Sequence, residues 1–110
     1  MALTPSNMLP LGTQAPAFDL LATDGARVSL SQFTSRRALL VAFICNHCPF
    51  VKHLRGGLAQ LARDYQHQDF AMVAINSNDT IAYPADDLTH MREEAVIAGY
   101  IFHYLLDETQ

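Results

Sequence analysis

Two short apolar runs, separated by a pattern typical of an amphipathic helix, restrict the fold more than any other feature of this sequence. Residues 38–44 (ALLVAFI) and 70–75 (FAMVAI) are apolar on both alternating faces, as expected of parallel strands covered on both sides. Between them, apolar side chains recur every three or four residues: Val51, Leu54, Leu58, Leu61 and Tyr65. Strand, helix and strand in this order form a right-handed crossover between parallel strands. We therefore expect residues 38–44 to be a central strand of an α/β sheet.

A hairpin is expected before this unit. Residues 17–20 and 27–30 have the apolar character of short strands, and Asp24-Gly25 lies between them. An Asp-Gly pair between two apolar runs is a strong signal for a tight turn. The sequence therefore predicts two antiparallel strands that open the fold.

A second helix and a third strand are expected after the unit. Asp86 and Asp87 can cap a helix that runs to Ala98, and Gly99 ends it. The side chains expected to face inward are Leu88, Met91, Ala95 and Ala98. Residues 101–106 then form the third strand, so the fold class is α/β, with a hairpin followed by βαβαβ.

Length and charge limit the organisation and the partners. The 110 residues predict a single domain over residues 1–110, with an irregular arm over 1–16 and the core over 17–110. The net charge is −4, and the basic residues are scattered, which argues against a nucleic-acid partner. No apolar run reaches the ~20 residues that span a bilayer, and the start lacks the pattern of a signal peptide. We expect a cytoplasmic protein without a membrane partner.

The only two cysteines, Cys45 and Cys48, follow the first apolar run and are three positions apart. In an α/β sheet, chemistry gathers at the carboxyl ends of the strands, where helices begin with unpaired N–H groups. Such a helix N-terminus stabilises a thiolate, and a protonated His47 would add to the effect. The pair therefore predicts a reactive, redox-active thiol.

Pro49 refines the position of the two thiols. Proline is favoured at the first helical position, where its missing N–H is not needed. Cys48 then becomes the N-cap, and its sulfur faces the free amides of Phe50 and Val51. Cys45 lies at the strand end or in the turn, close enough for a disulfide if the turn brings the two Cα atoms within ~4.4–6.8 Å.

Two simpler interpretations of the pair remain open. Both cysteines could be half-buried structural thiols. They could also bind a metal together with His47 or His53, but a structural zinc site needs four ligands, and no second Cys or His pair has the right spacing. We therefore expect neither a metal nor another cofactor.

Several stretches resemble one family across nearly the whole chain. They are CNHCP followed by FVKH, APAFDL, SLSQF, VAINSND, Tyr83-Pro84 and the closing YLLDETQ. They identify the chain as a member of a thioredoxin-like, peroxiredoxin-like family, related to alkyl hydroperoxide reductases and thiol-specific antioxidants. Its members are described as probable thiol-disulfide isomerases or thioredoxins. The resemblance implies a thioredoxin-like fold, antioxidant activity, a protein or small-molecule disulfide as substrate, and a thiol reductant as partner.

The resemblance also implies which part of the family pattern is absent. Family members continue beyond DETQ with a helix, a strand pair opened by a cis-proline that faces the thiols, and a last helix. This chain is therefore expected to lack the C-terminal strand pair and helix. An uncovered sheet edge would then favour a homo-oligomer.

Two alignments to the family assign the attacking thiol differently. Matching CNHC to the thioredoxin CxxC makes Cys45 the nucleophile. Aligning the preceding strand without gaps makes Cys48 the nucleophile and places Ala42 where thioredoxins have a buried acid. In the peroxiredoxin pattern Cys45 then replaces the Thr and Val41 the Pro, so thiol peroxidase is an alternative function. Together with the Pro49 argument, this favours Cys48.

The sequence as a whole predicts a thiol-disulfide oxidoreductase that works through a mixed disulfide. Its expected catalytic residues are Cys48, Cys45 and His47, and its expected substrate-binding residues are Pro49, Asn46 and Asn76. The competing hypothesis is a redox-inert, truncated thioredoxin-like module that keeps the motif without the substrate-holding half.

Overall fold

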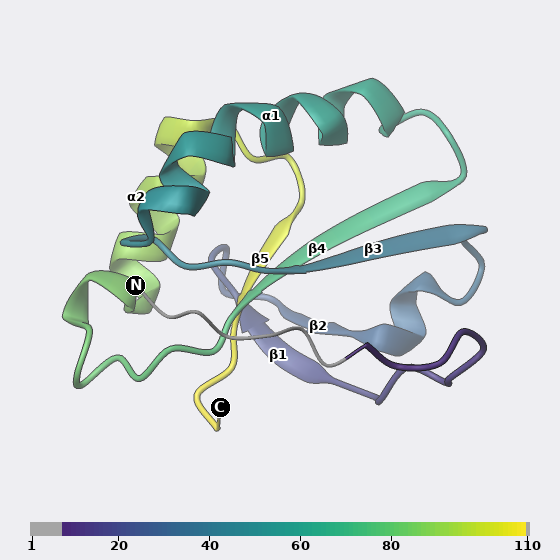
Figure 1. The fold of residues 1–110 in the computed structure, drawn as a ribbon, viewed down its shortest axis with the longest axis horizontal. Coiled ribbons are helices and arrows are strands. Elements are labelled where there is room, and N and C mark those ends of the chain that lie inside the picture. The colour runs from purple at the N-terminus through teal and green to yellow at the C-terminus, as the bar shows by residue number, and fades with distance from the viewer. Residues whose placement is uncertain (1–7, 110) are drawn as a thin grey trace.

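A computed structural model describes residues 8–109 and shows a five-stranded sheet with two helices (Figure 1). The strands are β1 (Asp19–Ala22), β2 (Arg27–Ser29), β3 (Ala38–Phe43), β4 (Phe70–Asn76) and β5 (His103–Leu106). The helices are α1 (Pro49–Tyr65) and α2 (Leu88–Ala98), and two short 3₁₀ turns are η1 (Leu30–Phe33) and η2 (Pro84–Asp86). Residues 1–7 of the predicted arm lie outside the described part of the chain.

The strand order is β2-β1-β5-β4-β3. β3, β4 and β5 are parallel, while β1 is antiparallel to both β2 and β5. The predicted hairpin is confirmed: Gly25 has a φ of 87°, and the Asp24 carboxylate accepts the Ala26 N–H at 3.0 Å. The α/β class and the order of elements are therefore as the sequence predicts.

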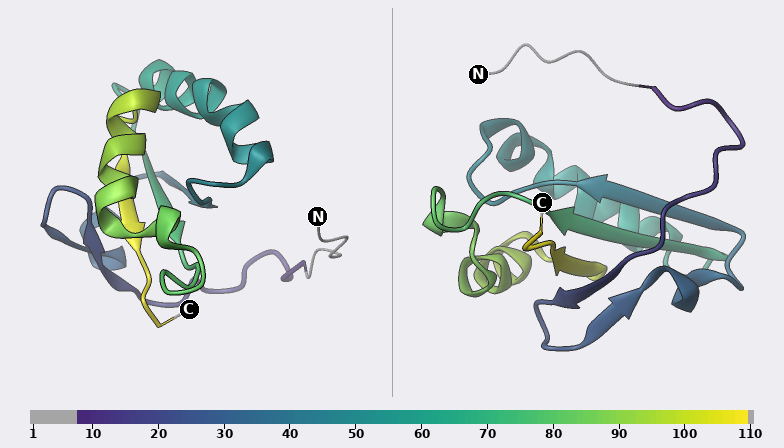
Figure 2. Two further views of the ribbon diagram at one scale, coloured as in Figure 1. Left: turned by 90° about the vertical axis from the view of Figure 1, so that its left-hand side faces the viewer. Right: turned by 90° about the horizontal axis from the view of Figure 1, so that it is seen from below.

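The two faces of the sheet carry separate apolar clusters because side chains alternate along each strand. One cluster joins Ala74, Tyr104 and Leu106 to Met91 of α2, and both helices lie on this side of the sheet (Figure 1). The other cluster contains Ala22, Val28, Val73, Ile75 and Leu105. On that side the chain before β1 crosses the sheet (Figure 2) and borders an apolar hollow of about 790 Å³.

The position of β3 corrects one prediction. In the described residues β3 pairs only with β4, so it is an edge strand and not a central one. Leu40 and Phe43 are exposed, with 71% of Phe43 accessible to solvent. An apolar run indicates that a strand can be buried. Its place in the sheet depends on contacts between distant segments of the chain. The expected central position is therefore wrong for this part of the chain, and the expected cover is only partial: Leu39 and Val41 pack against the core, whereas Phe43 does not.

The inward faces of the helices were predicted in part. In α1 the buried residues are Ala59 and Ala62, whereas Leu54 and Tyr65 are exposed. Small side chains let the helix approach the sheet closely, and the predicted Val51, Leu58 and Leu61 are half-buried. In α2 the prediction of an inward Met91 is confirmed, since it is fully buried.

Of the two aspartates that could start α2, only Asp87 caps the helix. Its carboxylate accepts the His90 N–H at 2.9 Å, and the helix ends at Gly99, whose φ of 73° suits a residue without a Cβ. Asp86 instead points into the protein, as described below. In residues 8–109 the structure contains no helix with the length and apolar character needed to cross a membrane.

Candidate functional site

The two cysteines lie in the short loop that leads from β3 into α1, at the carboxyl edge of the parallel strands. Cys48 is the N-cap of α1, with an extended backbone (φ −68°, ψ 122°), and Pro49 is the first helical residue. Both thiols are free and partly exposed. The N-cap position inferred from Pro49 is the observed one.

The surroundings give the two thiols different acidities. The backbone N–H of Val51, then that of Phe50, lowers the pKa of Cys48, because these unpaired helical donors attract the thiolate. The Cys48 side chain makes no capping hydrogen bond. The two amides therefore act by stabilising the negative charge of the Cys48 thiolate. Burial raises the pKa of Cys45, and the nearby Asp86 carboxylate raises it further, although the Cys48 N–H opposes both. Cys48 is therefore the more acidic thiol.

A buried carboxylate, Asp86 of η2, forms the centre of the site. Its side chain is fully buried and accepts three hydrogen bonds. The donors are the Asn46 backbone N–H at 2.6 Å, Nδ1 of His47, and the Asn78 side-chain amide at 2.9 Å. A buried carboxylate requires such donors to remain favourable. Asp86 thus ties the cysteine loop to the segment that follows β4.

The sequence prediction missed this role for Asp86. It treated Asp86 and Asp87 together as cap candidates, although a helix start needs only one of them. The presence of a second aspartate beside the cap was the available signal that one of the two has another role. It could not identify the partners, because two of the three donors lie 39 and 40 positions away in the chain.

His47 is held on two sides. Its Nδ1 contacts the Asp86 carboxylate, and its ring stacks on Tyr83 with centroids 4.8 Å apart and planes 7° from parallel. The His47 side chain is 38% exposed, so the ring connects a buried carboxylate with solvent. Ligating atoms of Cys45, His47 and Asp86 all lie within 4.8 Å of one another. The structure therefore brings His47 next to the less acidic thiol.

Asn46 lies between the two cysteines and is buried. Its side-chain amide donates to the Ala85 carbonyl at 2.9 Å, and its side-chain oxygen accepts the Tyr104 hydroxyl at 2.9 Å. Pro49, in contrast, is exposed at the start of α1. Asn46 thus anchors the loop on β5, while Pro49 stays accessible.

Asn76, at the end of β4, is fully buried. Its amide donates to the Asp86 carbonyl at 3.2 Å, and its side-chain oxygen accepts the Asn78 N–H at 3.1 Å. These bonds position the Asp86 segment against the sheet. A part for Pro49, Asn46 and Asn76 in substrate binding stays a prediction, and the contacts of the two asparagines are with the protein itself.

Cys45, His47 and Asp86 are the only described group of three or more His, Cys, Asp or Glu residues with ligating atoms this close together. The group fits a metal poorly, because both carboxylate oxygens already accept hydrogen bonds from Asn46, His47 and Asn78. A structural zinc ion also requires four ligands. The arrangement suits proton and thiol chemistry better than metal coordination.

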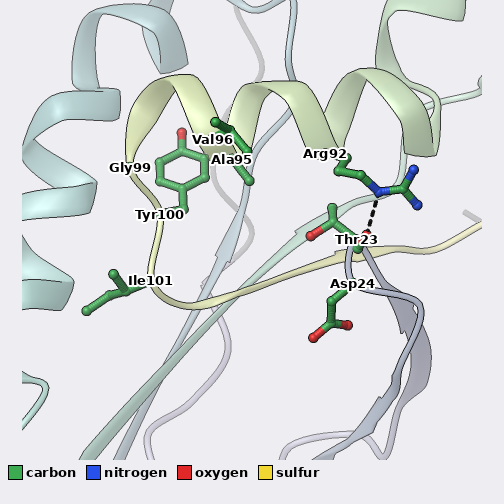
Figure 3. Close-up of a pocket in the computed structure, with 8 residues that line it drawn as sticks. All are labelled: Thr23, Asp24, Arg92, Ala95, Val96, Gly99, Tyr100 and Ile101. Atoms are coloured by element: carbon green, nitrogen blue, oxygen red, sulfur yellow. Dashed lines mark hydrogen bonds between the residues drawn. The ribbon is translucent and has the colours of Figure 1, made fainter.

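Two hollows border α2. A cleft of about 240 Å³ lies beside His47 and is bordered by the Arg55–Glu94 ion pair at 2.9 Å. A larger hollow of about 550 Å³ lies between α2 and the β1–β2 turn, where Arg92 donates to the Thr23 carbonyl at 2.8 Å (Figure 3). No cysteine or histidine lines the larger hollow, whereas His47 lines the smaller cleft.

Two solved structures are similar to this chain over nearly its whole length. An uncharacterized conserved protein from Geobacillus kaustophilus is 50% identical, with a TM-score of 0.95, over 100% of this chain and 59% of that chain. A hypothetical protein from Sinorhizobium meliloti is 46% identical, with a TM-score of 0.91, over 94% of this chain and 57% of that chain. The chain therefore spans under two thirds of the length of these relatives.

More distant structures share the fold. A thiol:disulfide interchange protein of the thioredoxin family from Chlorobium tepidum has a TM-score of 0.72 at 20% identity, over 93% of this chain and 63% of that chain. A comparison with curated proteins found no significant match. The family model described as Redoxin matches residues 10–110. The chain therefore belongs to the redoxin family and has a thioredoxin-like fold.

Proposed function

We propose that this protein is a thiol-disulfide oxidoreductase in which Cys48 attacks the substrate disulfide and Cys45 resolves the mixed disulfide. The observation that carries the proposal is the difference between the two thiols. The helix N-terminus lowers the pKa of Cys48, whereas burial raises the pKa of Cys45. The thiolate is the nucleophile in disulfide exchange, so the more acidic and accessible thiol attacks first.

The reaction has two exchange steps. The Cys48 thiolate attacks one sulfur of the substrate disulfide and releases the other as a thiolate. Cys45 then attacks the Cys48 sulfur, closes the Cys45–Cys48 disulfide and releases the second substrate thiol. The dithiol loses two electrons and the substrate disulfide gains them. An external thiol reductant returns the protein to the dithiol form.

The test is alkylation of the Cys45→Ser and Cys48→Ser variants across a pH series, combined with a disulfide-reduction assay of the unaltered chain. The variant that keeps only Cys48 is expected to react at a lower pH than the variant that keeps only Cys45. The unaltered chain should form an internal disulfide under mild oxidation.

The proposal fails if both single thiols titrate near the free-cysteine value of about 8.5 and no internal disulfide forms. Rapid formation of a sulfenic acid with peroxide, without reduction of disulfides, would also count against it, since that result marks a peroxidase.

A further inference from the structure

We propose that His47, positioned by Asp86, accepts the proton of Cys45 when Cys45 attacks the mixed disulfide. The inference rests on the proposed function above and assigns the acid–base groups of its second step. It makes His47 a catalytic base and Asp86 a positioning residue that acts through the His47 ring.

The need for a base follows from the environment of Cys45. Burial and the neighbouring Asp86 carboxylate raise the pKa of its thiol, so Cys45 carries its proton when the mixed disulfide forms. Only a thiolate attacks a disulfide efficiently. The thiol must therefore lose a proton within the site, and Ala42 of β3, which precedes the loop, offers no acceptor.

Two groups lie near enough to take this proton. One ring nitrogen of His47 and one carboxylate oxygen of Asp86 lie within 4.8 Å of the Cys45 sulfur. That limit is longer than a direct hydrogen bond, so transfer runs through one water or through a tighter contact in the mixed disulfide. The hydrogen bonds that His47 and Asp86 already make decide which of them accepts the proton.

Asp86 is the less available acceptor, because its two oxygens already accept three hydrogen bonds, from Asn46, Asn78 and His47, of the roughly four that a carboxylate can take. Since Nδ1 of neutral His47 must donate to this carboxylate, its proton is fixed on Nδ1 and Nε2 is left as an acceptor. The stack on Tyr83 holds the ring in this orientation. Partial exposure of the ring lets the accepted proton pass on to solvent.

Cys45 gives its proton to Nε2 of His47 while its sulfur bonds to the Cys48 sulfur. The bond between Cys48 and the substrate sulfur breaks, and the electron pair leaves with the substrate as a thiolate. The imidazolium then returns its proton to that thiolate or to water. The positive charge on the ring lies beside the Asp86 carboxylate while it exists.

Other titratable groups lie around the same ring. Cys45, Asp86 and Tyr83 lie next to it, and the cleft beside it is lined by Lys52, Arg55, His90, Glu93 and Glu94 of α1 and α2. Arg55 and Glu94 neutralise each other in an ion pair. None of the others touches Nδ1 in the described structure, so Asp86 is the group that fixes the tautomer.

The experiment separates the two steps with dithiobis(nitrobenzoate), an aromatic disulfide that releases coloured thionitrobenzoate. Attack by Cys48 releases a first equivalent, and resolution by Cys45 releases a second. We expect His47→Gln to slow the second phase by about a hundredfold or more relative to the first, within the range of general-base catalysis. Its second phase should then rise in direct proportion to hydroxide concentration. Imidazole added to His47→Ala should restore the second phase.

The matched control is His67→Gln, an exposed histidine in the loop after α1, which should keep both phases. Asp86→Asn should slow the second phase as well, because the His47 ring is then less firmly positioned. The inference is overturned if the unaltered chain shows two phases and the His47 variants keep the second phase and its pH profile. If the unaltered chain shows no second phase, the proposed function itself fails.

Discussion

Replacing Asp86 with alanine should destabilise the fold as well as the site, and the structure allows the size of the effect to be worked out. The substitution leaves three donors without their acceptor: the Asn46 N–H, the His47 ring and the Asn78 amide. An unpaired buried donor costs about 1–3 kcal/mol. Asn46 is only 7% exposed and should incur the full penalty. Water can reach the other two, so we expect a total loss of about 3 kcal/mol.

For a domain of this size, a loss of about 3 kcal/mol lowers the midpoint of thermal unfolding by about 13 °C. Urea unfolding followed by circular dichroism measures the free energy directly. The matched control is Asp87→Ala, which removes an exposed cap from the adjacent position and should have a smaller effect. Equal losses for the two variants would refute the assignment of Asp86 as the buried anchor of the loop.

Three further predictions concern stability away from the thiols. The hydrogen bonds between Asp87 and His90 lower the pKa of Asp87 and raise the pKa of His90. The stabilisation from Asp87 is therefore lost as the pH falls through the pKa of Asp87 in the folded protein. The stabilisation from His90 is lost as the pH rises through the pKa of His90 in the folded protein. Urea midpoints should therefore show the pair's contribution at about pH 5.5 and lose it on both sides, and Asp87→Ala should flatten this dependence. The buried Tyr100 hydroxyl has no hydrogen-bond partner in the described structure, whereas that of Tyr104 donates to a buried acceptor. Tyr100→Phe should leave the urea midpoint unchanged or raise it, whereas Tyr104→Phe should lower the free energy of unfolding by about 1–2 kcal/mol. A larger loss for Tyr100→Phe than for Tyr104→Phe would contradict these hydrogen-bond assignments. Gly99→Ala should cost about 1–2 kcal/mol in urea unfolding because its φ is positive, and no loss would show that the helix end can rearrange.

Local patterns were sufficient for much of the fold and for one half of the site. The Asp24-Gly25 turn and the apolar runs are short-range signals, and the structure shows the elements that they predict. Pro49 was equally informative, since its preference for the first helical turn places Cys48 at the N-cap. These features depend on a few neighbouring residues, so the sequence carries them directly.

The missing half of the site depends on long-range contacts. Nothing local to Asp86 distinguishes a helix cap from a buried anchor, because its donors come from the loop after β3 and from the segment after β4. The edge position of β3 and the outward turn of Leu54 have the same origin. Each is decided by which segments pack together, and the periodicity of a single segment does not contain that information.

The polar network around Asp86 has a practical consequence for studying this protein. Its bonds connect Asn46 to residues 40 and 58 positions away, so the network exists only when the sheet is assembled. The contrast between a shielded Cys45 and an activated Cys48 exists only in that state as well, because an unfolded chain would give both thiols the same surroundings. The ratio of their labelling rates is thus a built-in reporter of folding that requires no added probe.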